Sequence, residues 1–391
     1  MSRTARILPF LLVALSGCGG SYARLQQEAD VPALARLGEA YEALPGKQLL
    51  LAAGRAGDAP VRIAAREARA AASDRLVVLV HGVLSDSRTW RFVAGELGRD
   101  HSLLLVDLPG CGESDAPTPD DAGKRFYSPT GLARALLAAL RSHAAGAKPP
   151  PRLALVGHSL GGMVILRMLG DAELRREYAD VVGRVDRAVL ISTPDFAVER
   201  QHPVFKEVAD AGGLKIGLGA VLGVLRARTA QTVLDATGDE ALALREEADR
   251  LFEILKDARR RRPAQAMLKE AVPFRDDERP DWPAIERLVA DYANVRVPVL
   301  LIAGARDETF PAAMNYKLSI QLPDARLRVL SGKMHSPHLE APGQCGGLIR
   351  EFLGNGGEGV AQSTEAAAPE PAPEPAPEPA PTPAPPPTPT P

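Results

Sequence analysis

The residues Gly157-His158-Ser159-Leu160-Gly161 place a serine between two glycines that stand two positions before and two positions after it. A run of apolar residues (153–156) precedes this stretch, and a helical pattern follows it. On a sharp turn from a strand into a helix, such a serine presents its hydroxyl group to an incoming substrate, and the glycines permit the close backbone approach. The pattern therefore predicts a nucleophile, Ser159, with Gly157 and Gly161 shaping its turn. A purely structural turn is the alternative.

A nucleophilic serine needs a base that takes its proton and a carboxylate that orients the base. The base is expected to be a histidine late in the chain, where His335 and His338 are the candidates. Asp307 follows the apolar run 299–302, and Asp195 follows the apolar run 188–191. Both aspartates are therefore candidates for the acid, because roles and geometry define such a triad.

The charge that develops on the substrate oxygen needs two hydrogen-bond donors. Leu160 opens the helix after Ser159, and helix amino ends offer free N–H groups. His81-Gly82-Val83 ends the apolar run 76–80, and the loop after such a strand supplies the second donor. We therefore expect the backbone N–H groups of Val83 and Leu160 to form the oxyanion hole. The His81 side chain is expected to be structural.

The elements that position these residues form an alternating pattern. Continuous apolar runs are typical of strands buried on both faces, and helical patterns such as 131–142 and 162–169 lie between most of them. This alternation predicts an α/β protein with a mostly parallel sheet. The predicted strands are 76–80, 103–106, 153–156, 188–191 and 299–302, with 327–330 as a weaker edge strand.

Two segments interrupt the alternation. Residues near 22–45 resemble an amphipathic helix that precedes the sheet, and residues 195–282 contain helices but no convincing strand. Because the second segment is inserted between two sheet strands, we expect it to lie over the strand ends as a cap. Within it, residues 214–225 are largely apolar but too short to span a bilayer. They either pack on the core or face lipid or an acyl chain.

Three motifs together resemble the α/β-hydrolase superfamily, and more narrowly its cap-bearing branch of esterases, lipases and carbon–carbon bond hydrolases. They are Val80-His81-Gly82, the segment 107–114 (Asp-Leu-Pro-Gly-Cys-Gly-Glu-Ser) and the segment 157–162, which occur in the family's order and spacing. The resemblance covers about residues 60–353. It implies the α/β-hydrolase fold, with a mostly parallel central sheet, flanking helices and an inserted helical cap.

The segment 332–342 also resembles the family's final segment, in which a catalytic histidine precedes a glutamate and then a proline. Glu340 and Pro342 occupy the matching offsets and select His335 as the base, with His338 as the competitor. Asp307 occupies the family's acid position, and Asp195 remains the alternative. The resemblance makes Asp107 structural. A serine at the elbow argues against haloalkane dehalogenases and epoxide hydrolases, which use an aspartate there.

The ends of the chain differ in character from the body. Arg3 and Arg6 precede a short apolar stretch (7–15), and Leu15-Ser16-Gly17-Cys18 resembles a bacterial lipoprotein signal. This resemblance implies lipidation of Cys18 and anchoring to the cell envelope, with Gly19 favouring the outer membrane of a Gram-negative cell. The tail is rich in Pro, Ala and Glu, which predicts an extended spacer or a ligand for an envelope partner.

These observations predict six segments along the chain. They are a signal peptide (1–17), an N-terminal tether and helix (18–59), the first part of the core (60–194), a helical cap (195–282), the second part of the core (283–354) and a disordered tail (355–391).

The composition limits the classes of function. The 391 residues include 47 Lys and Arg against 49 Asp and Glu, 25% charged residues and 45% hydrophobic residues, which is typical of a globular protein. A near-neutral chain gives no electrostatic footprint for nucleic acid. Three cysteines cannot form a four-thiolate zinc site, and no metal or cofactor is expected. A disulfide between Cys111 and Cys345 is conceivable for an exported protein.

The predicted function is therefore that of a lipid-anchored serine hydrolase acting on a small-molecule acyl substrate, most economically a carboxylic ester. Carbon–carbon bond hydrolysis, thioester hydrolysis and acyl transfer are the alternatives on the same fold. A non-catalytic protein that binds or tethers in the envelope is the alternative of another class.

Overall fold

The computed structural model describes residues 20–354, apart from residues 58, 71–72, 124, 146–150, 199–202, 238–243, 276 and 278. The predicted signal peptide (1–17), Cys18 and the predicted tail (355–391) lie outside the described residues. No helix within the described part of the chain combines the length and the hydropathy that a bilayer crossing requires.

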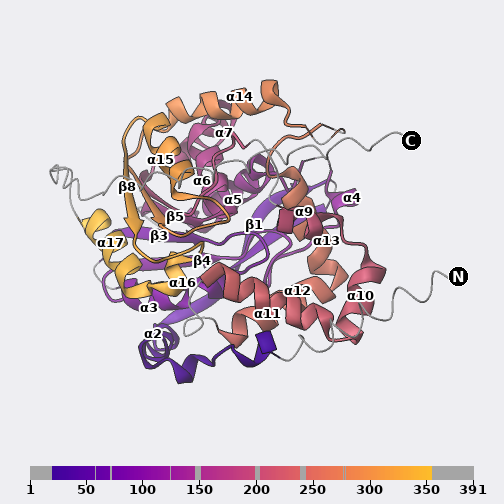
Figure 1. Ribbon diagram of the computed structural model, residues 1–391. Coiled ribbons are helices and arrows are strands. Elements are labelled where there is room, and N and C mark those ends of the chain that lie inside the picture. The colour runs from indigo at the N-terminus through magenta and orange to yellow at the C-terminus, as the bar shows by residue number, and fades with distance from the viewer. Residues whose placement is uncertain are drawn as a thin grey trace, which may run out of the picture. The chain divides into compact units, whose positions relative to one another are not determined.

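An eight-stranded sheet forms the centre of the molecule, with the spatial order β1-β2-β4-β3-β5-β6-β7-β8 (Figure 1). Neighbouring strands from β4 to β8 are parallel, whereas β1 and β2 pair antiparallel at one edge. The six predicted apolar runs all lie in β3 to β8, so the predicted fold class is confirmed. The strands are β1 (Gly46–Ala56), β2 (Ala59–Ala68), β3 (Arg75–Val80), β4 (Ser102–Val106), β5 (Arg152–His158), β6 (Val185–Ile191), β7 (Val299–Gly304) and β8 (Ala325–Leu330).

The first two strands were not predicted. We expected a tether and a helix over residues 18–59. Helix α2 (Pro32–Glu42) lies in this segment, but strand β1 occupies the last part of the segment. Burial along β1 is interrupted because this edge strand faces solvent on much of its length. A half-exposed antiparallel strand lacks the continuous apolar run that marks a strand buried on both faces.

Helices cover both faces of the sheet because alternate strand residues point to opposite sides. Val78 and Val80 join the larger hydrophobic core, whereas Val77 and Leu79 join the smaller one. The helices on the larger core are α5 (Pro129–Ala144), α6 (Leu160–Gly170), α7 (Ala172–Glu177), α8 (Ala179–Val182), α14 (Trp282–Ala290) and α15 (Ala312–Gln321). Those on the smaller core are α3 (Arg91–Leu97) and α17 (Pro342–Gly354).

Cys111 and Cys345 belong to these two different cores, and both thiols are free. Because the sheet separates the cores, the conceivable disulfide does not form in this structure. Burial raises the pKa of the Cys345 thiol to about 12.

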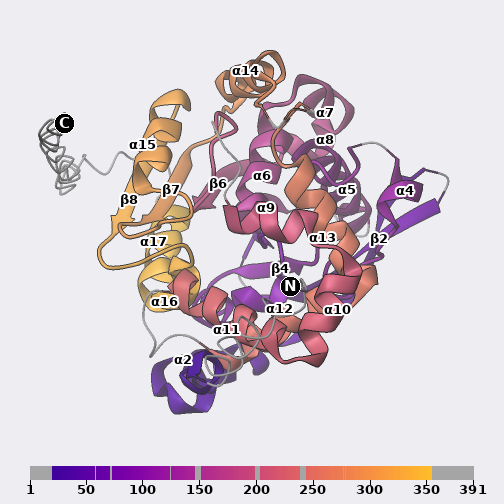
Figure 2. The same ribbon diagram turned by 45° about the vertical axis from the view of Figure 1, so that its right-hand side comes forward.

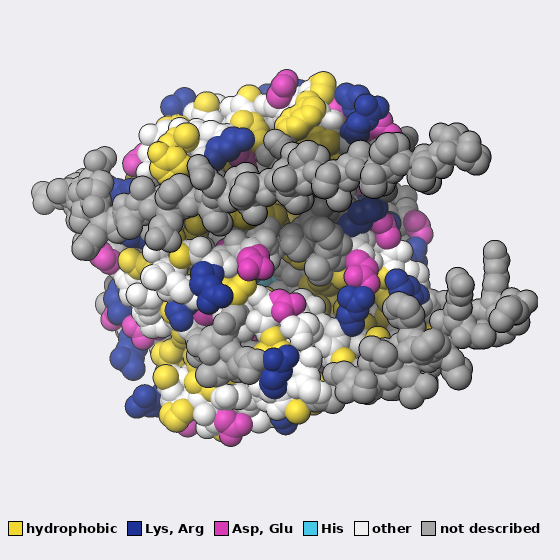
Figure 3. Space-filling model, in the orientation of Figure 1, with side chains coloured by type: hydrophobic (Ala, Val, Ile, Leu, Met, Phe, Trp, Pro, Cys, Tyr) yellow, Lys and Arg dark blue, Asp and Glu magenta, His cyan; other side chains and the backbone are white. Residues whose placement is uncertain are grey.

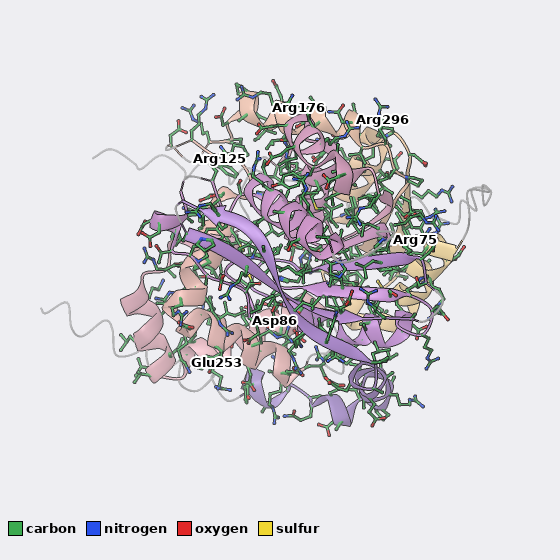
Figure 4. All side chains as sticks on the ribbon, turned by 180° about the vertical axis from the view of Figure 1, so that it is seen from behind. Arg75, Asp86, Arg125, Arg176, Glu253 and Arg296 are labelled. Carbon is green, nitrogen blue, oxygen red and sulfur yellow. The ribbon has the colours of Figure 1, made fainter. Side chains whose placement is uncertain are left out.

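Within the described residues between β6 and β7, the five helices that precede α14 form the cap, which lies in front of the strand ends in Figure 2. They are α9 (Pro203–Asp210), α10 (Gly213–Val221), α11 (Val224–Thr237), α12 (Arg245–Lys256) and α13 (Ala258–Glu270). The view from behind shows Asp86 and Glu253 on the cap side of the molecule, whereas Arg75 lies at the opposite end of β3 (Figure 4). The loop that follows β3 therefore meets the cap.

Candidate active site

Ser159 stands at the turn between β5 and α6, with φ 51° and ψ −119°. This conformation is strained for a residue other than glycine. A Cβ atom at Gly157 would lie 2.6 Å from the backbone carbon of Gly161, and one at Gly161 would lie 2.3 Å from the carbonyl oxygen of Val80. Both predicted glycines are therefore required by close backbone contacts. The turn aims the buried Ser159 towards the cap, where it lines an apolar pocket.

The two predicted oxyanion donors lie on either side of this serine. Leu160 is the first residue of α6, so its N–H has no acceptor within the helix. Val83 follows β3 and lines the same pocket as Ser159 and Leu160. A Cβ atom at Gly82 would lie 3.2 Å from the Cβ atom of Ser159, which shows how closely the Val83 loop approaches the serine. The structure thus brings the predicted donors to the predicted nucleophile.

His335 and Asp307 form a buried pair. The Nδ1 atom of His335 lies 2.9 Å from an Oδ atom of Asp307. The other carboxylate oxygen accepts the N–H groups of Thr309 and Phe310, each at 2.9 Å, so the carboxylate is fixed in place. Because a carboxylate accepts, Nδ1 carries the proton and Nε2 is left as the basic nitrogen. The pair has the arrangement that a general base and its orienting acid require.

The competing residues have other partners. Asp195 accepts a hydrogen bond from the hydroxyl group of Tyr292 at 2.9 Å and another from the side chain of Gln321 at 3.1 Å. His338 is fully buried, and its Nε2 atom lies 2.9 Å from the Thr89 hydroxyl oxygen. The structure thus pairs Asp307 with His335 and places Asp195 and His338 in separate hydrogen-bonding groups.

His158, the residue before Ser159, links the two halves of the site. Its Nε2 atom lies 2.9 Å from the backbone carbonyl oxygen of His335, and its ring centre lies 5.0 Å from that of His335 and 4.3 Å from that of His338. Burial, followed by the charge of His335, lowers the pKa of His158 to about 3, so its ring is neutral and donates to the carbonyl group. Sequence reasoning missed this role because the position before the serine carries no fixed residue type in the pattern.

Glu340 holds the backbone on both sides of His335. Its carboxylate oxygens accept the N–H groups of Met334 at 2.9 Å and Ser336 at 3.0 Å. Burial raises the pKa of Glu340 to about 7. The sequence analysis used Glu340 only to identify the family's final segment, whereas the structure shows that it supports the loop of the candidate base.

Asp107 and His81 are structural, as expected from the sequence. Asp107 accepts the N–H of Ser87 at 2.7 Å and that of Glu113 at 2.8 Å, which joins the loop after β3 to the loop after β4. The Nε2 atom of His81 accepts the N–H of Leu108 at 3.0 Å. The proton of the neutral ring is therefore on Nδ1, which lies 2.7 Å from the carbonyl oxygen of Gly82.

The candidate nucleophile opens onto an apolar pocket whose empty space, counted together with the open solvent at its mouth, is about 570 Å³. Core residues form one wall and the cap helices α9 and α13 form much of the other. Every residue in the lining other than Ser159 is apolar; these residues are Val83, Leu160, Met163, Pro194, Val198, Phe205, Met267, Leu268, Ala271, Val272, Phe274 and Phe310. Phe310 connects the pocket to the base, because its ring centre lies 5.5 Å from that of His335 and 6.0 Å from that of Phe205. Within the described residues, no cluster of three or more His, Cys, Asp or Glu side chains could hold a metal ion.

Comparison with known proteins identifies a matching family and similar sequences. A model of the Alpha/beta hydrolase family matches residues 77–345. A pimeloyl-[acyl-carrier protein] methyl ester esterase from Aromatoleum aromaticum is 29% identical over 290 residues, which cover 71% of this chain and 97% of that protein.

Two solved structures show the same fold. The esterase RhEst1 from Rhodococcus sp. ECU1013 matches 79% of this chain and 98% of its own, with a TM-score of 0.58 and 21% identity. The 2-hydroxy-6-oxo-6-phenylhexa-2,4-dienoate hydrolase from Rhodococcus sp. strain RHA1 matches 80% of this chain and 100% of its own, with a TM-score of 0.59 and 20% identity.

Proposed function

Because the chain belongs to the Alpha/beta hydrolase family, we propose that it is a serine hydrolase that cleaves carboxylic esters through Ser159, His335 and Asp307. The observation that carries the proposal is the strained Ser159 turn, which opens onto an apolar pocket. The candidate base His335, which Asp307 orients and His158 links to the strand of the serine, supports the same assignment. The esterase from Aromatoleum aromaticum supports the choice of an ester.

The reaction proceeds through an acyl-enzyme. The Ser159 oxygen attacks the ester carbonyl carbon while its proton passes to Nε2 of His335, and Asp307 stabilises the resulting imidazolium. The N–H groups of Val83 and Leu160 donate to the oxyanion. His335 then gives the proton to the departing alkoxide, which leaves as an alcohol. Water attacks the acyl-enzyme, His335 takes and returns a proton, and a carboxylic acid leaves free Ser159.

The pocket favours an uncharged ester over a substrate that carries a carboxylate. No Lys or Arg stands among the described residues that line it. An unpaired carboxylate in an apolar pocket is costly because no group replaces its hydration. The Rhodococcus sp. RHA1 hydrolase, by its name, acts on a dienoate, whereas this pocket offers a dienoate no cationic partner. Ester hydrolysis therefore fits this site better than carbon–carbon bond hydrolysis of that kind.

The proposed enzyme is anchored to the bacterial cell envelope through lipids on Cys18. The support is the sequence Leu15-Ser16-Gly17-Cys18 at the end of a short apolar stretch. Two or more acyl chains anchor a protein stably, whereas one chain does not. Gly19 favours the outer membrane if the cell is Gram-negative. In this proposal the tail (355–391) is a spacer.

The proposed activity is tested with p-nitrophenyl esters from acetate to palmitate, using the full chain and its Ser159→Ala variant. The matched control is Ser192→Ala, because Ser192 is also a buried serine with positive φ at the end of the neighbouring strand. We expect hydrolysis by the parent and by S192A but not by S159A, with the chain-length optimum reporting the length of the pocket. A folded protein that hydrolyses none of these esters would overturn the proposal.

A further inference from the structure

The first described residues of the chain lie on the cap rather than on the core. Ser21 donates a hydrogen bond to the side chain of Gln231 on α11 at 3.0 Å, and the Tyr22 hydroxyl group donates to Asp249 on α12 at 2.9 Å. Leu25 is buried in a small hydrophobic cluster with Ala230, Val233, Leu234 and Ala248 of the same two helices. Polar and apolar contacts together therefore hold the beginning of the chain against α11 and α12.

This arrangement fixes where a lipid on Cys18 would be attached. Cys18 precedes Gly20, the first described residue, by two positions. Two residues span at most about 7 Å even when fully extended. A lipid on Cys18 would therefore be attached two residues before a segment that contacts α11 and α12.

The same side of the cap carries exposed apolar side chains. On α10, Leu218 is 58% exposed and Val221 is 85% exposed, and Leu222, just after the helix, is 37% exposed. Ile216 on the same helix is buried. We call Leu218, Val221 and Leu222 the α10 patch. Clustered exposed apolar residues on a soluble domain mark a surface that meets another apolar body.

The α10 patch and the start of the chain are neighbours. Arg226 follows Leu222 by four residues, and its guanidinium group donates to the Tyr22 hydroxyl oxygen at 3.0 Å and lies 5.0 Å from the centre of the Tyr22 ring. Figures 1 and 2 both show α10 next to the other cap helices, on the opposite side of the molecule from α15 and β8. The first described residues and α10 thus contact the same two cap helices, α11 and α12.

The basic residues beside the α10 patch are balanced by acids from neighbouring helices. Arg226 pairs with Asp249 of α12, and Arg228 pairs with Glu207 of α9 at 3.1 Å. The exposed apolar side chains, rather than net charge, therefore suit a phospholipid surface. On the face drawn in Figure 3, Lys and Arg side chains are likewise interspersed with Asp and Glu over the described part of the surface.

We propose that the α10 patch docks on the lipid bilayer that holds the acyl chains of Cys18, so that the cap faces the membrane. The proposal rests on the anchoring included in the proposed function. A few partly exposed side chains would bind a bilayer weakly alone, because each adds only a small apolar area to the contact. Attachment at Cys18 makes the contact intramolecular, so its effective concentration is high. Hydrophobic esters dissolved in that bilayer would then lie next to the helices that line the pocket.

The test uses the lipidated full chain on phosphatidylcholine vesicles. Val221→Cys and, as a matched control, Ile320→Cys are labelled with an environment-sensitive fluorophore. Ile320 is 68% exposed on α15, away from the cap. The native Cys111 and Cys345 are buried, and burial raises the pKa of both thiols, so the label goes to the introduced thiol. Lipids that carry a nitroxide quench fluorophores that enter the bilayer.

We expect the label at position 221 to lose most of its fluorescence to the nitroxide lipid and the label at position 320 to lose little. Adding Leu218→Asp and Leu222→Asp should relieve the quenching at position 221, whereas adding the control Leu50→Asp should not. Equal quenching at both positions, or none at position 221, in protein that still floats with the vesicles would overturn the docking and leave the anchor intact. Failure of the parent chain to float would overturn the anchor, and the docking with it. Hydrolysis of soluble esters tests the catalytic proposal separately.

Discussion

The loops at the sheet ends and the cap meet at one pocket but are built on different principles. In the loops, buried polar groups are fixed by directional hydrogen bonds. Asp307 accepts two backbone N–H groups, and Glu340 accepts two others. The part of the pocket wall that the cap contributes is made of apolar side chains. Directional bonds fix atoms to fractions of an ångström, whereas apolar packing fixes mainly volume. We infer that the loops determine whether a bond is cleaved and that the cap determines which acyl group fits.

A buried ionic network joins the two regions. Arg91, only 2% exposed, pairs with Glu28 from the beginning of the chain at 3.2 Å and with Glu247 of the cap at 2.8 Å. Arg250 of the cap pairs with the same Glu247 at 2.9 Å and with Asp86, in the loop after Val83, at 3.5 Å. These ion pairs therefore hold the cap against the loop that contains Val83, a predicted oxyanion donor. Four predictions test whether the two regions have different roles.

The largest effect is expected within the loops, where Asp307→Asn should lower kcat for ester hydrolysis by about 10⁴-fold. An amide cannot accept as a carboxylate does, so the imidazole loses its correct tautomer and its stabilising charge. The control is Asp195→Asn, which should retain most of the parental kcat because Asp195 is bonded to Tyr292 and Gln321. Steady-state kinetics with circular dichroism as a folding check decides the matter. A greater loss in D195N than in D307N would assign the acid to Asp195.

The second effect concerns the ionic network between the loops and the cap. Arg91→Met should lower the free energy of unfolding by about 3–5 kcal/mol. Removing Arg91 takes away the partner of Glu28 and leaves the largely buried Glu247 with Arg250 alone. Although burial opposes ionisation, the charges of Arg250 and Arg91 lower the pKa of Glu247 to about 2, so this carboxylate is charged.

The matched control for Arg91→Met is Arg88→Met, which removes an exposed ion pair with Glu246. It should lower the free energy of unfolding by only about 0–1 kcal/mol. Urea unfolding of both variants measures the two losses. Equal losses would show that the buried network does not fasten the cap.

The third effect concerns the cap wall, where Ala271→Phe should lower kcat/KM for long-chain esters by about 10–200-fold and leave p-nitrophenyl acetate largely unaffected. Ala271 lines the pocket, and each methylene that no longer fits costs transition-state binding. The control is Ala258→Phe at the exposed start of α13, the helix that Ala271 follows. The chain-length profile of each variant provides the measurement, and a uniform loss over all chain lengths in A271F would contradict a role in selection.

The smallest effect concerns pH. The pKa of His158 is about 3 in the folded protein against 6.5 for the free side chain, so the unfolded chain binds one more proton between these values. The free energy of unfolding therefore falls as the pH is lowered from 6.5, at about 1.4 kcal/mol per pH unit for each such group. His158→Gln keeps a donor for the His335 carbonyl group and should make the slope shallower by that amount. Urea unfolding at several pH values measures it, and a slope equal to that of the parent would contradict a buried neutral histidine.

The sequence predicted the sheet where physical constraints leave a clear pattern. Strands β3 to β7 were found because parallel strands covered on both faces, such as 76–80 and 299–302, must be apolar at nearly every position. The edge strand β8 is only partly buried and accordingly gave the weaker signal. The edge strand β1 was missed because its exposed face carries polar and charged residues such as Lys47 and Arg55, which interrupt the pattern.

The site was predictable only in part, for a different reason. The spacing around Ser159 and the resemblance near Asp307 and His335 identified candidate residues, but their pairing depends on loops that meet only in three dimensions. Nothing in the sequence indicates that His158 donates to the backbone of His335, 177 positions away. The cap residues that line the pocket were equally hidden, because helix packing rather than periodicity decides which apolar residues face it.

Whether Ser159 is the nucleophile can be measured by reacting the folded full chain with a fluorophosphonate and locating the adduct by mass spectrometry. We predict one adduct, on the peptide that contains Ser159, and no labelling of S159A. Addition of an uncharged ester substrate should slow the labelling. A folded protein that reacts at another residue, or does not react at all, would contradict the claim.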